Sequence, residues 1–152
     1  QRYNILLNFT KMKQFIFTFC MFCVLYAAGQ EKDNLTGQVI GLMKAQESSW
    51  NKADIRGFMQ HYWNSDSLKF IGSKGITFGW QKTLDNYLSA YPSKEMMGEL
   101  SFTILEATAL SPEAIYVVGK WDLKKDKPTG GYFTLLWKKK EGRWVIVSDH
   151  TS

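Results

Sequence analysis

The feature that most constrains the fold is the carboxy-terminal stretch, residues 130–152, which reads GGYFTLLWKKKEGRWVIVSDHTS. Two runs of β-branched and aromatic residues lie on either side of Glu141 and Gly142, and such runs are typical of strands. The Glu–Gly pair suits the tight turn of a β-hairpin, whose turn residues adopt positive φ. With these two as the turn, antiparallel pairing predicts the facing residues. They are Lys140 with Arg143, Trp137 with Ile146, and Phe133 with His150.

Alternation along the two strands sorts their side chains onto two faces of a sheet. One face is predicted to carry Phe133, Leu135, Trp137, Trp144, Ile146, Ser148 and His150. The other is predicted to carry Thr134, Leu136, Lys138, Val145, Val147 and Asp149. Both faces are partly apolar, so neither is suited to water alone. We therefore expect helices on one face and a second copy of the protein on the other.

The order of elements before the hairpin predicts an α+β domain. Apolar residues recur at helical spacing over about residues 34–50, 54–62 and 80–91, with Asp33–Asn34 and Asp54 as candidate N-caps. Strands are predicted over about residues 68–71, 99–108 and 114–123, and the Gly-rich residues 72–79 are predicted to be irregular. Helices followed by a meander indicate helices on one side of an antiparallel sheet.

The amino-terminal residues have the pattern of a secretory signal peptide. A basic start at Met12 is followed by an apolar run and then by small residues before Gln30. We predict a signal peptide over residues 12–29 and a mature domain over residues 30–152. We expect that residues 1–11 result from a translation start assigned too far upstream of Met12. A buried amino-terminal helix or an uncleaved anchor is the alternative. The mature domain is then exported, to the periplasm or outside the cell, without a membrane attachment.

Removal of this leader changes the charge and the cysteine content of the protein. Both cysteines, Cys20 and Cys23, lie in the leader, so the mature domain has no disulfide and no thiol. Three of the 19 basic residues precede the expected cleavage site and all 14 acids follow it, which leaves a net charge of +2. So small a charge gives no reason to expect a nucleic acid as partner.

Three sequence blocks, in this order of elements, resemble the nuclear transport factor 2-like superfamily, and most closely its small exported bacterial members. The blocks are SWNKAD at residues 49–54, GWQKTLDNYLSAY at 79–91, and FTLLW at 133–137 with GRWVIVSDHTS at 142–152. The resemblance covers about residues 34–152 and includes SnoaL-like and ketosteroid-isomerase-like domains. It says little about activity, because one fold serves many functions.

The resemblance implies a cystatin-like cone, with three amino-terminal helices packed on a curved antiparallel sheet of four to six strands. The cone would enclose an apolar pocket, and a homodimer would form across the outer face of the sheet. On this basis the face that carries Trp144, Ile146, Ser148 and His150 would look into the pocket. The resemblance implies no cofactor.

The isomerase-like members use a tyrosine in the first helix and an aspartate near the end of the first strand. These positions fall on Gln46 and on or beside Phe70, so that acid–base pair is not found and the sequence favours a protein that is not an enzyme. The catalytic candidates are His150, whose imidazole titrates near neutral pH, and Asp122. The competing interpretations are a structural histidine at the mouth of the cone and an exposed ion pair for Asp122. Two histidines without a carboxylate cluster give no basis for a metal site.

The many aromatic residues suit a pocket for a flat or hydrophobic molecule. The candidate pocket residues are Trp50, Tyr62, Trp80, Tyr87, Trp121, Phe133, Trp144, Ser148 and His150. The leading hypothesis is binding of a small hydrophobic or carbonyl-containing molecule without catalysis. The alternatives are a SnoaL-like or isomerase-like enzyme that uses His150 as acid and base, and a dimeric structural or interaction module. A cavity smaller than roughly 300 Å³ would favour the module.

Overall fold

The structure is a computed structural model that describes residues 29–152. The chain divides into two units, Gln1–Asn34 and Leu35–Ser152. Of the first unit only residues 29–34 are described, and they are helical. The upstream segment and the predicted leader lie outside the described residues, apart from Gly29. All that follows concerns the unit Leu35–Ser152.

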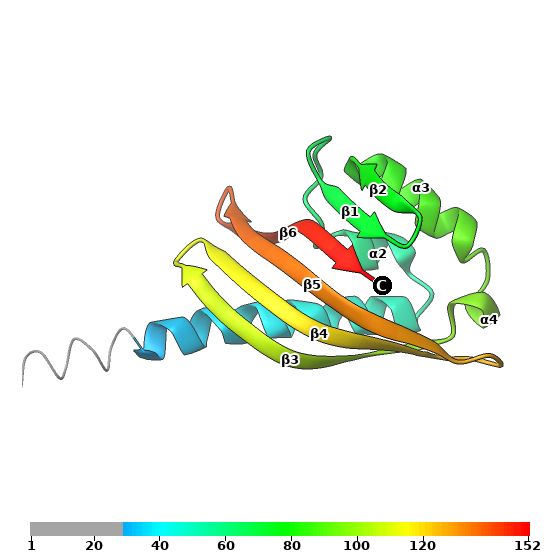
Figure 1. Cartoon of the computed structure of the whole chain (residues 1–152), viewed down its shortest axis with the longest axis horizontal. Helices are drawn as coiled ribbons and strands as arrows, with labels where there is room; N and C mark the ends of the chain where they lie inside the picture. Colours follow the sequence, from blue (N-terminus) through cyan, green and yellow to red (C-terminus); the bar gives the residue numbers. More distant parts are fainter. Residues whose placement is uncertain (1–28) are drawn as a thin grey trace, which may run out of the picture. The chain divides into compact units, whose positions relative to one another are not determined.

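A six-stranded sheet forms the larger part of this unit. Its strands are β1 (Lys69–Gly72), β2 (Gly75–Phe78), β3 (Glu99–Ser111), β4 (Ala114–Lys124), β5 (Thr129–Lys140) and β6 (Arg143–Thr151). They lie in the order β2-β1-β6-β5-β4-β3 (Figure 1). All neighbouring pairs are antiparallel except β1 and β6, which run parallel. The predicted α+β class with a mostly antiparallel sheet is confirmed.

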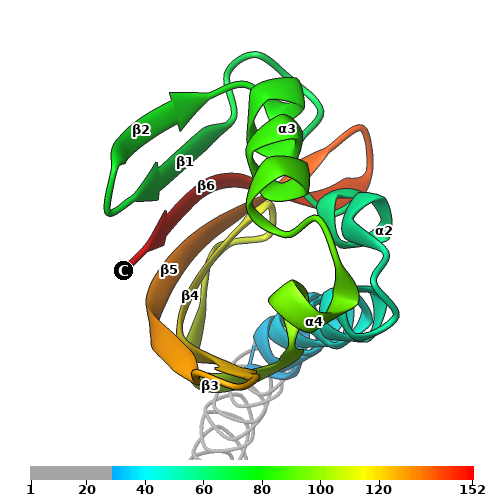
Figure 2. The same cartoon turned by 90° about the vertical axis from the view of Figure 1, so that its right-hand side faces the viewer.

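Helical segments cover one face of this sheet. They are residues 35–51, α2 (Ile55–Met59), α3 (Trp80–Ala90) and α4 (Lys94–Met97). Figure 2 shows them on the concave side of the curved sheet. The stripe predicted for the first helix is buried at Val39, Met43 and Trp50, which pack in one core cluster with sheet residues such as Trp137. No described helix is both long and apolar enough to cross a lipid bilayer.

Several predicted boundaries differ from the structure. Asp54 caps α2 as predicted, with its carboxylate accepting from the Gly57 amide at 2.8 Å. Asp33 and Asn34, in contrast, are themselves helical, so the predicted helix start there is wrong. The helix α4, which Ser93 caps, and the short strand β2 were both missed because the stretches around them are short and rich in turn residues.

The second helix ends at Met59, before the predicted Tyr62, because the next residues pair with the sheet. Tyr62 forms an isolated parallel bridge with Ile146. The Trp63 amide donates to the Ile146 carbonyl at 2.9 Å, and the Ile146 amide donates to the His61 carbonyl at 2.8 Å. A helical peptide cannot make these bonds, so the bridge ends the helix early and holds Tyr62 against β6.

The hairpin of β5 and β6 has the predicted turn but not the predicted register throughout. Glu141 and Gly142 have φ of 51° and 77°, and the predicted partners Lys140 and Arg143 face one another. Trp137 also faces Ile146 as predicted, but the register then shifts and leaves Val147 as an extra residue on β6. Beyond this bulge Phe133 pairs with Thr151 instead of His150. A one-residue slip turns every later side chain of β6 to the opposite face.

Candidate functional site

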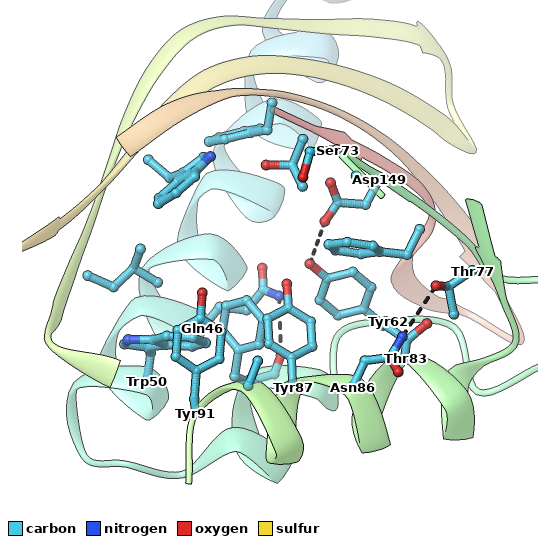
Figure 3. Close-up of a pocket in the computed structure, with 18 of the residues that line it drawn as sticks. Gln46, Trp50, Tyr62, Ser73, Thr77, Thr83, Asn86, Tyr87, Tyr91 and Asp149 are labelled. Carbon is cyan, nitrogen blue, oxygen red and sulfur yellow. Dashed lines mark hydrogen bonds between the residues drawn. The ribbon is translucent and has the colours of Figure 1, made fainter. Parts of the chain in front are cut away.

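A cavity of about 560 Å³ lies between the concave face of the sheet and the helices (Figure 3). Its volume exceeds the roughly 300 Å³ that separates a ligand pocket from a filled core. Five of the predicted pocket residues line it: Trp50, Tyr62, Tyr87, Trp121 and Phe133. The predicted aromatic lining is thus brought together by the first helix, the segment after α2, α3 and the strands β4 and β5.

Contacts between aromatic rings form much of the helical wall. The ring of Trp50 meets those of Phe58 and Tyr91 edge to face, with centroids 5.2 and 4.8 Å apart. Tyr87 packs in the same way on Phe58 at 5.5 Å and on Phe70 at 5.7 Å. The Trp50 Nε1–H donates to the Met97 carbonyl at 3.2 Å, which fixes its indole. The wall is therefore apolar and restrained before any ligand binds.

On the sheet side, a glycine makes room for one of the rings. Phe133 of β5 pairs with Gly119 of β4, and a Cβ at Gly119 would overlap the Phe133 ring. The ring can thus lie across β4 and line the cavity because position 119 has no side chain.

A buried carboxyl group and a phenol meet in the cavity wall. The Tyr62 hydroxyl donates to Asp149 Oδ2 at 2.6 Å, and Figure 3 shows the two side chains pointing toward one another. The bridge to Ile146 holds Tyr62, and the bulge at Val147 turns Asp149 inward. Asp149 is 4% exposed, and its Oδ1 has no hydrogen-bond partner among the described residues.

Burial changes the acidity of this group and of the phenols around it. Burial raises the pKa of Asp149 to about 7, although the hydrogen bond from Tyr62 acts in the opposite direction. The pKa values of Tyr62 and Tyr87 are well above the usual range, mainly through burial and then through the negative charge of Asp149. A carboxyl that is half protonated near neutral pH can either donate or accept a proton there.

Several other polar side chains line the cavity, and some of them are bound within the protein: Thr83 Oγ1–H donates to the Gly79 carbonyl at 2.8 Å, and Asn86 Nδ2–H donates to Thr77 Oγ1 at 3.3 Å. Gln46, at the position of the family's tyrosine, lines the cavity and donates from Nε2 to the Phe58 carbonyl at 3.2 Å. Phe70, at or beside the position of the family's aspartate, also lines it. Asp149 is the one acid and Lys74 the one base among the described lining residues. The chain therefore has a carboxyl–phenol pair in its cavity, but on different elements from those that the resemblance implied.

The structure contradicts the predicted orientation of His150. This residue is exposed and does not line the cavity, because the bulge at Val147 places Asp149 on the inner face in its stead. Ser148 also lies outside the lining, paired with Leu136. Trp144 is buried in the core, away from the cavity.

Two further candidates lie elsewhere. Trp80 borders a second hollow, and its Nε1–H donates to the Met59 carbonyl at 2.9 Å. Asp122 lies outside the cavity lining and accepts from Lys120 Nζ at 2.8 Å, which is the exposed ion pair that we weighed against catalysis. In the described part of the chain, no group of three or more His, Cys, Asp or Glu side chains is placed to hold a metal ion.

Sequence reasoning missed Asp149 as a cavity residue. One signal was present: residues 144–147 read Trp-Val-Ile-Val, an unbroken apolar run. Such a run does not alternate, so it leaves open which face each later residue takes. Strict alternation across this run was the wrong assumption.

Comparisons with solved structures agree with this architecture. An NTF-2 like protein of unknown function from Shewanella oneidensis MR-1 is 45% identical and superposes with a TM-score of 0.75, over 77% of this chain and 98% of that one. An NTF2-like superfamily protein from Salmonella enterica serovar Typhimurium is 18% identical, with a TM-score of 0.62 over 79% and 91%.

A third similar structure is a ketosteroid isomerase-like protein from Erwinia carotovora atroseptica. It is 19% identical, with a TM-score of 0.59 over 74% of this chain and 90% of that one. At such identities the likeness shows the fold alone. No protein-family model and no curated protein matches the sequence.

Proposed function

The chain belongs to the NTF2-like superfamily, and on that premise we propose that it binds a small, mostly apolar molecule in its cavity. One observation carries the proposal: an aromatic-lined space of about 560 Å³ has a single buried carboxyl, hydrogen-bonded to a phenol, in its wall. Space lined by restrained rings favours an apolar body. The carboxyl favours a ligand with one polar group at that end.

The polar group of the ligand is best a carbonyl or a hydroxyl. A protonated Asp149 donates to a carbonyl oxygen, and an ionised Asp149 accepts from a hydroxyl. Because the pKa of Asp149 is about 7, both forms are present near neutral pH. A fully ionised acid would instead meet the buried carboxylate and be repelled.

The test is a thermal-shift screen of apolar carbonyl and hydroxyl compounds, combined with mass spectrometry of small molecules released when the purified protein is denatured. A compound that binds the folded protein should raise the Tm, and the Tm should keep rising as the free concentration exceeds the Kd. Asp149→Asn should weaken binding of that compound several-fold. His150→Gln, a change at the next residue on the exposed side, should not. Absence of any shift and of any released molecule would contradict the proposal.

A second candidate function is proton transfer on a bound carbonyl compound, with Asp149 as the acid and base. It is favoured by a carboxyl whose pKa of about 7 suits a general base at neutral pH. The ionised carboxylate, held by the Tyr62 hydroxyl, would take a proton from the carbon next to the carbonyl, and the phenol of Tyr87 would donate to the oxyanion.

Deuterium exchange at that carbon, followed by NMR, tests this candidate. The exchange rate should rise with pH through about 7 and be lost in Asp149→Asn. Binding without exchange in the unaltered protein would leave only the binding function.

We also propose that two copies meet across the outer face of the sheet. Tyr132 is 60% exposed there, opposite Lys120, and the neighbouring cross-strand pairs are Tyr116 with Leu136 and Val118 with Thr134. A second copy would cover these apolar groups. Sedimentation should show a dimer that Tyr132→Asp weakens; a monomer at high concentration would contradict the proposal.

A further inference from the structure

A second hollow, of about 480 Å³, lies at the other side of Tyr62. The residues that border it include Arg56 of α2 and Gln60, the C-cap of that helix. Trp63 and Asn64 of the following segment also border it, as do Lys140 and Arg143, which flank the β5–β6 turn. Tyr62 lines both spaces, so the hollow is a neighbour of the cavity and not a part of it.

The walls of this hollow are held by backbone bonds. The two hydrogen bonds between residues 61–63 and Ile146 join the segment after α2 to β6. The Trp80 indole, also in the wall, is fixed by its bond to the Met59 carbonyl. The Trp80 indole and the backbone of Trp63 are therefore restrained.

The charges around the hollow are mostly positive and unbalanced. Arg56, Lys140 and Arg143 border it, and Glu141 is the one acid among its described lining residues. The ion pair found among the described residues is Lys120–Asp122, so none of these three cations has an acidic partner within 4.0 Å.

Two of these cations are placed against one another by the fold. Lys140 and Arg143 face each other directly across the hairpin, and like charges in that position destabilise a sheet. Lys140 Nζ also lies 4.8 Å from the centre of the Trp63 ring, which keeps the ammonium at the hollow. An anion between Lys140 and Arg143 would relieve this repulsion.

We propose that the second hollow binds a small aromatic anion. Its carboxylate or phosphate group lies between Lys140 and Arg143, and its ring packs against the indoles. A guanidinium binds both groups through paired N–H donors, and an ammonium adds a point charge. The amides of Gln60 and Asn64 supply further donors at the same rim. This site is independent of the function proposed for the main cavity.

The experiment measures binding of 1-naphthoate and 1-naphthyl phosphate to the full domain by titration calorimetry and by NMR of the indole N–H signals. Inorganic phosphate and 1-naphthalenemethanol test the charge and the ring separately. We expect both aromatic anions to bind, with shifts at Trp63 and Trp80. Inorganic phosphate and 1-naphthalenemethanol should each bind at least about tenfold more weakly than the two aromatic anions.

Charge-matched variants locate the site. Arg143→Gln should raise the Kd about tenfold or more, and Lys140→Gln with Arg143→Gln should abolish binding. Lys124→Gln, at the last residue of β4, and Asp149→Asn, in the main cavity, should leave the Kd within about twofold. Arg143→Lys keeps the positive charge but loses the paired N–H donors of the guanidinium, and this variant should bind the aromatic anions with intermediate affinity. Circular dichroism confirms that each variant is folded.

The proposal is overturned by any of three results. The first is no binding of either aromatic anion at millimolar concentration. The second is an equal loss in Lys124→Gln, which would mean diffuse attraction by the positive surface. The third is full affinity in the Lys140→Gln, Arg143→Gln double variant.

Discussion

Two aspartates on strands of the same sheet, Asp149 and Asp122, differ in almost everything except their hydrogen bonds. Each accepts one short bond, from the Tyr62 hydroxyl at 2.6 Å and from Lys120 Nζ at 2.8 Å. Asp149 is 4% exposed, whereas 44% of the Asp122 side chain is exposed. Burial raises the pKa of Asp149 to about 7. Burial is what lets the carboxyl of Asp149 exchange protons near neutral pH, whereas the side chain of Asp122 stays in contact with water.

The physical reason is the loss of hydration. A carboxylate moved from water into an apolar wall loses solvation that one neutral phenol does not replace, so its protonated form is favoured. At the surface, water solvates both members of the Lys120–Asp122 pair and screens their attraction. The pKa of Lys120 is nevertheless raised by the bond from its ammonium to Asp122.

The largest expected effect is on the pH dependence of stability. The folded pKa of Asp149, about 7, lies above its ordinary value of 3.8, so between these values the native state keeps a proton that the unfolded state has lost. The free energy of unfolding therefore falls as the pH rises from about 4 to about 7, by on the order of 4 kcal/mol, and levels off above. Urea unfolding of Asp149→Asn should lack this fall and show greater stability than the unaltered protein at pH 8.

The difference between the stability–pH curves of the unaltered protein and of Asp149→Asn isolates the contribution of Asp149. His61, whose pKa burial lowers, gives the opposite slope, because its native state binds protons less well than its unfolded state. That contribution is the same in both proteins and cancels. Parallel curves for the two proteins would show that Asp149 is ionised in the native state at low pH. Burial would then not raise the pKa of Asp149, and the difference drawn between it and the exposed Asp122 would be wrong.

Tyr62→Phe should have a smaller effect. It removes the donor to Asp149 Oδ2 and leaves the ring, so a buried oxygen loses its partner at a cost of about 1–3 kcal/mol. Because that bond lowers the pKa of Asp149, its loss should raise this pKa further. Carbon-13 NMR of the carboxyl group measures the shift. An unchanged titration midpoint would mean that the phenol does not bind the carboxylate in solution.

The smallest effect is expected at Asp122. Asp122→Asn removes a solvent-exposed pair, which salt already screens, so the free energy of unfolding should stay within the error of the measurement from pH 5 to pH 8. Lys120→Gln is the matched change on the partner. If either variant altered stability as much as Asp149→Asn, exposure would not be what separates the two aspartates.

The sequence predicted most of the architecture because its local signals agree with one another. The Glu141–Gly142 turn, the Asp54 cap and the stripe of the first helix were each visible in a few residues and are confirmed. The resemblance implied an enclosed pocket and the abundance of aromatic residues predicted its lining, of which five predicted members line the cavity. These features depend on turn chemistry and hydrophobic spacing, which act over short distances along the chain.

The polar part of the site depended on a choice that no local signal makes. The run of apolar residues before Asp149 fits either face of the sheet, so alternation could not decide between Asp149 and His150. Pairing with β5 decided it, through the extra residue at Val147. In the same way, the approach of Tyr62 to Asp149 requires a bridge between segments that lie far apart in the sequence.

The amino-acid sequence by itself determined the class of fold, the final hairpin and the apolar character of the cavity, because each arises from neighbours along the chain. The tertiary structure alone decided that the carboxyl of Asp149 enters that cavity and that the imidazole of His150 faces solvent. The physical reason is that a single bulge reverses the direction of every side chain after it, and where strands slip is settled by the packing of the whole sheet.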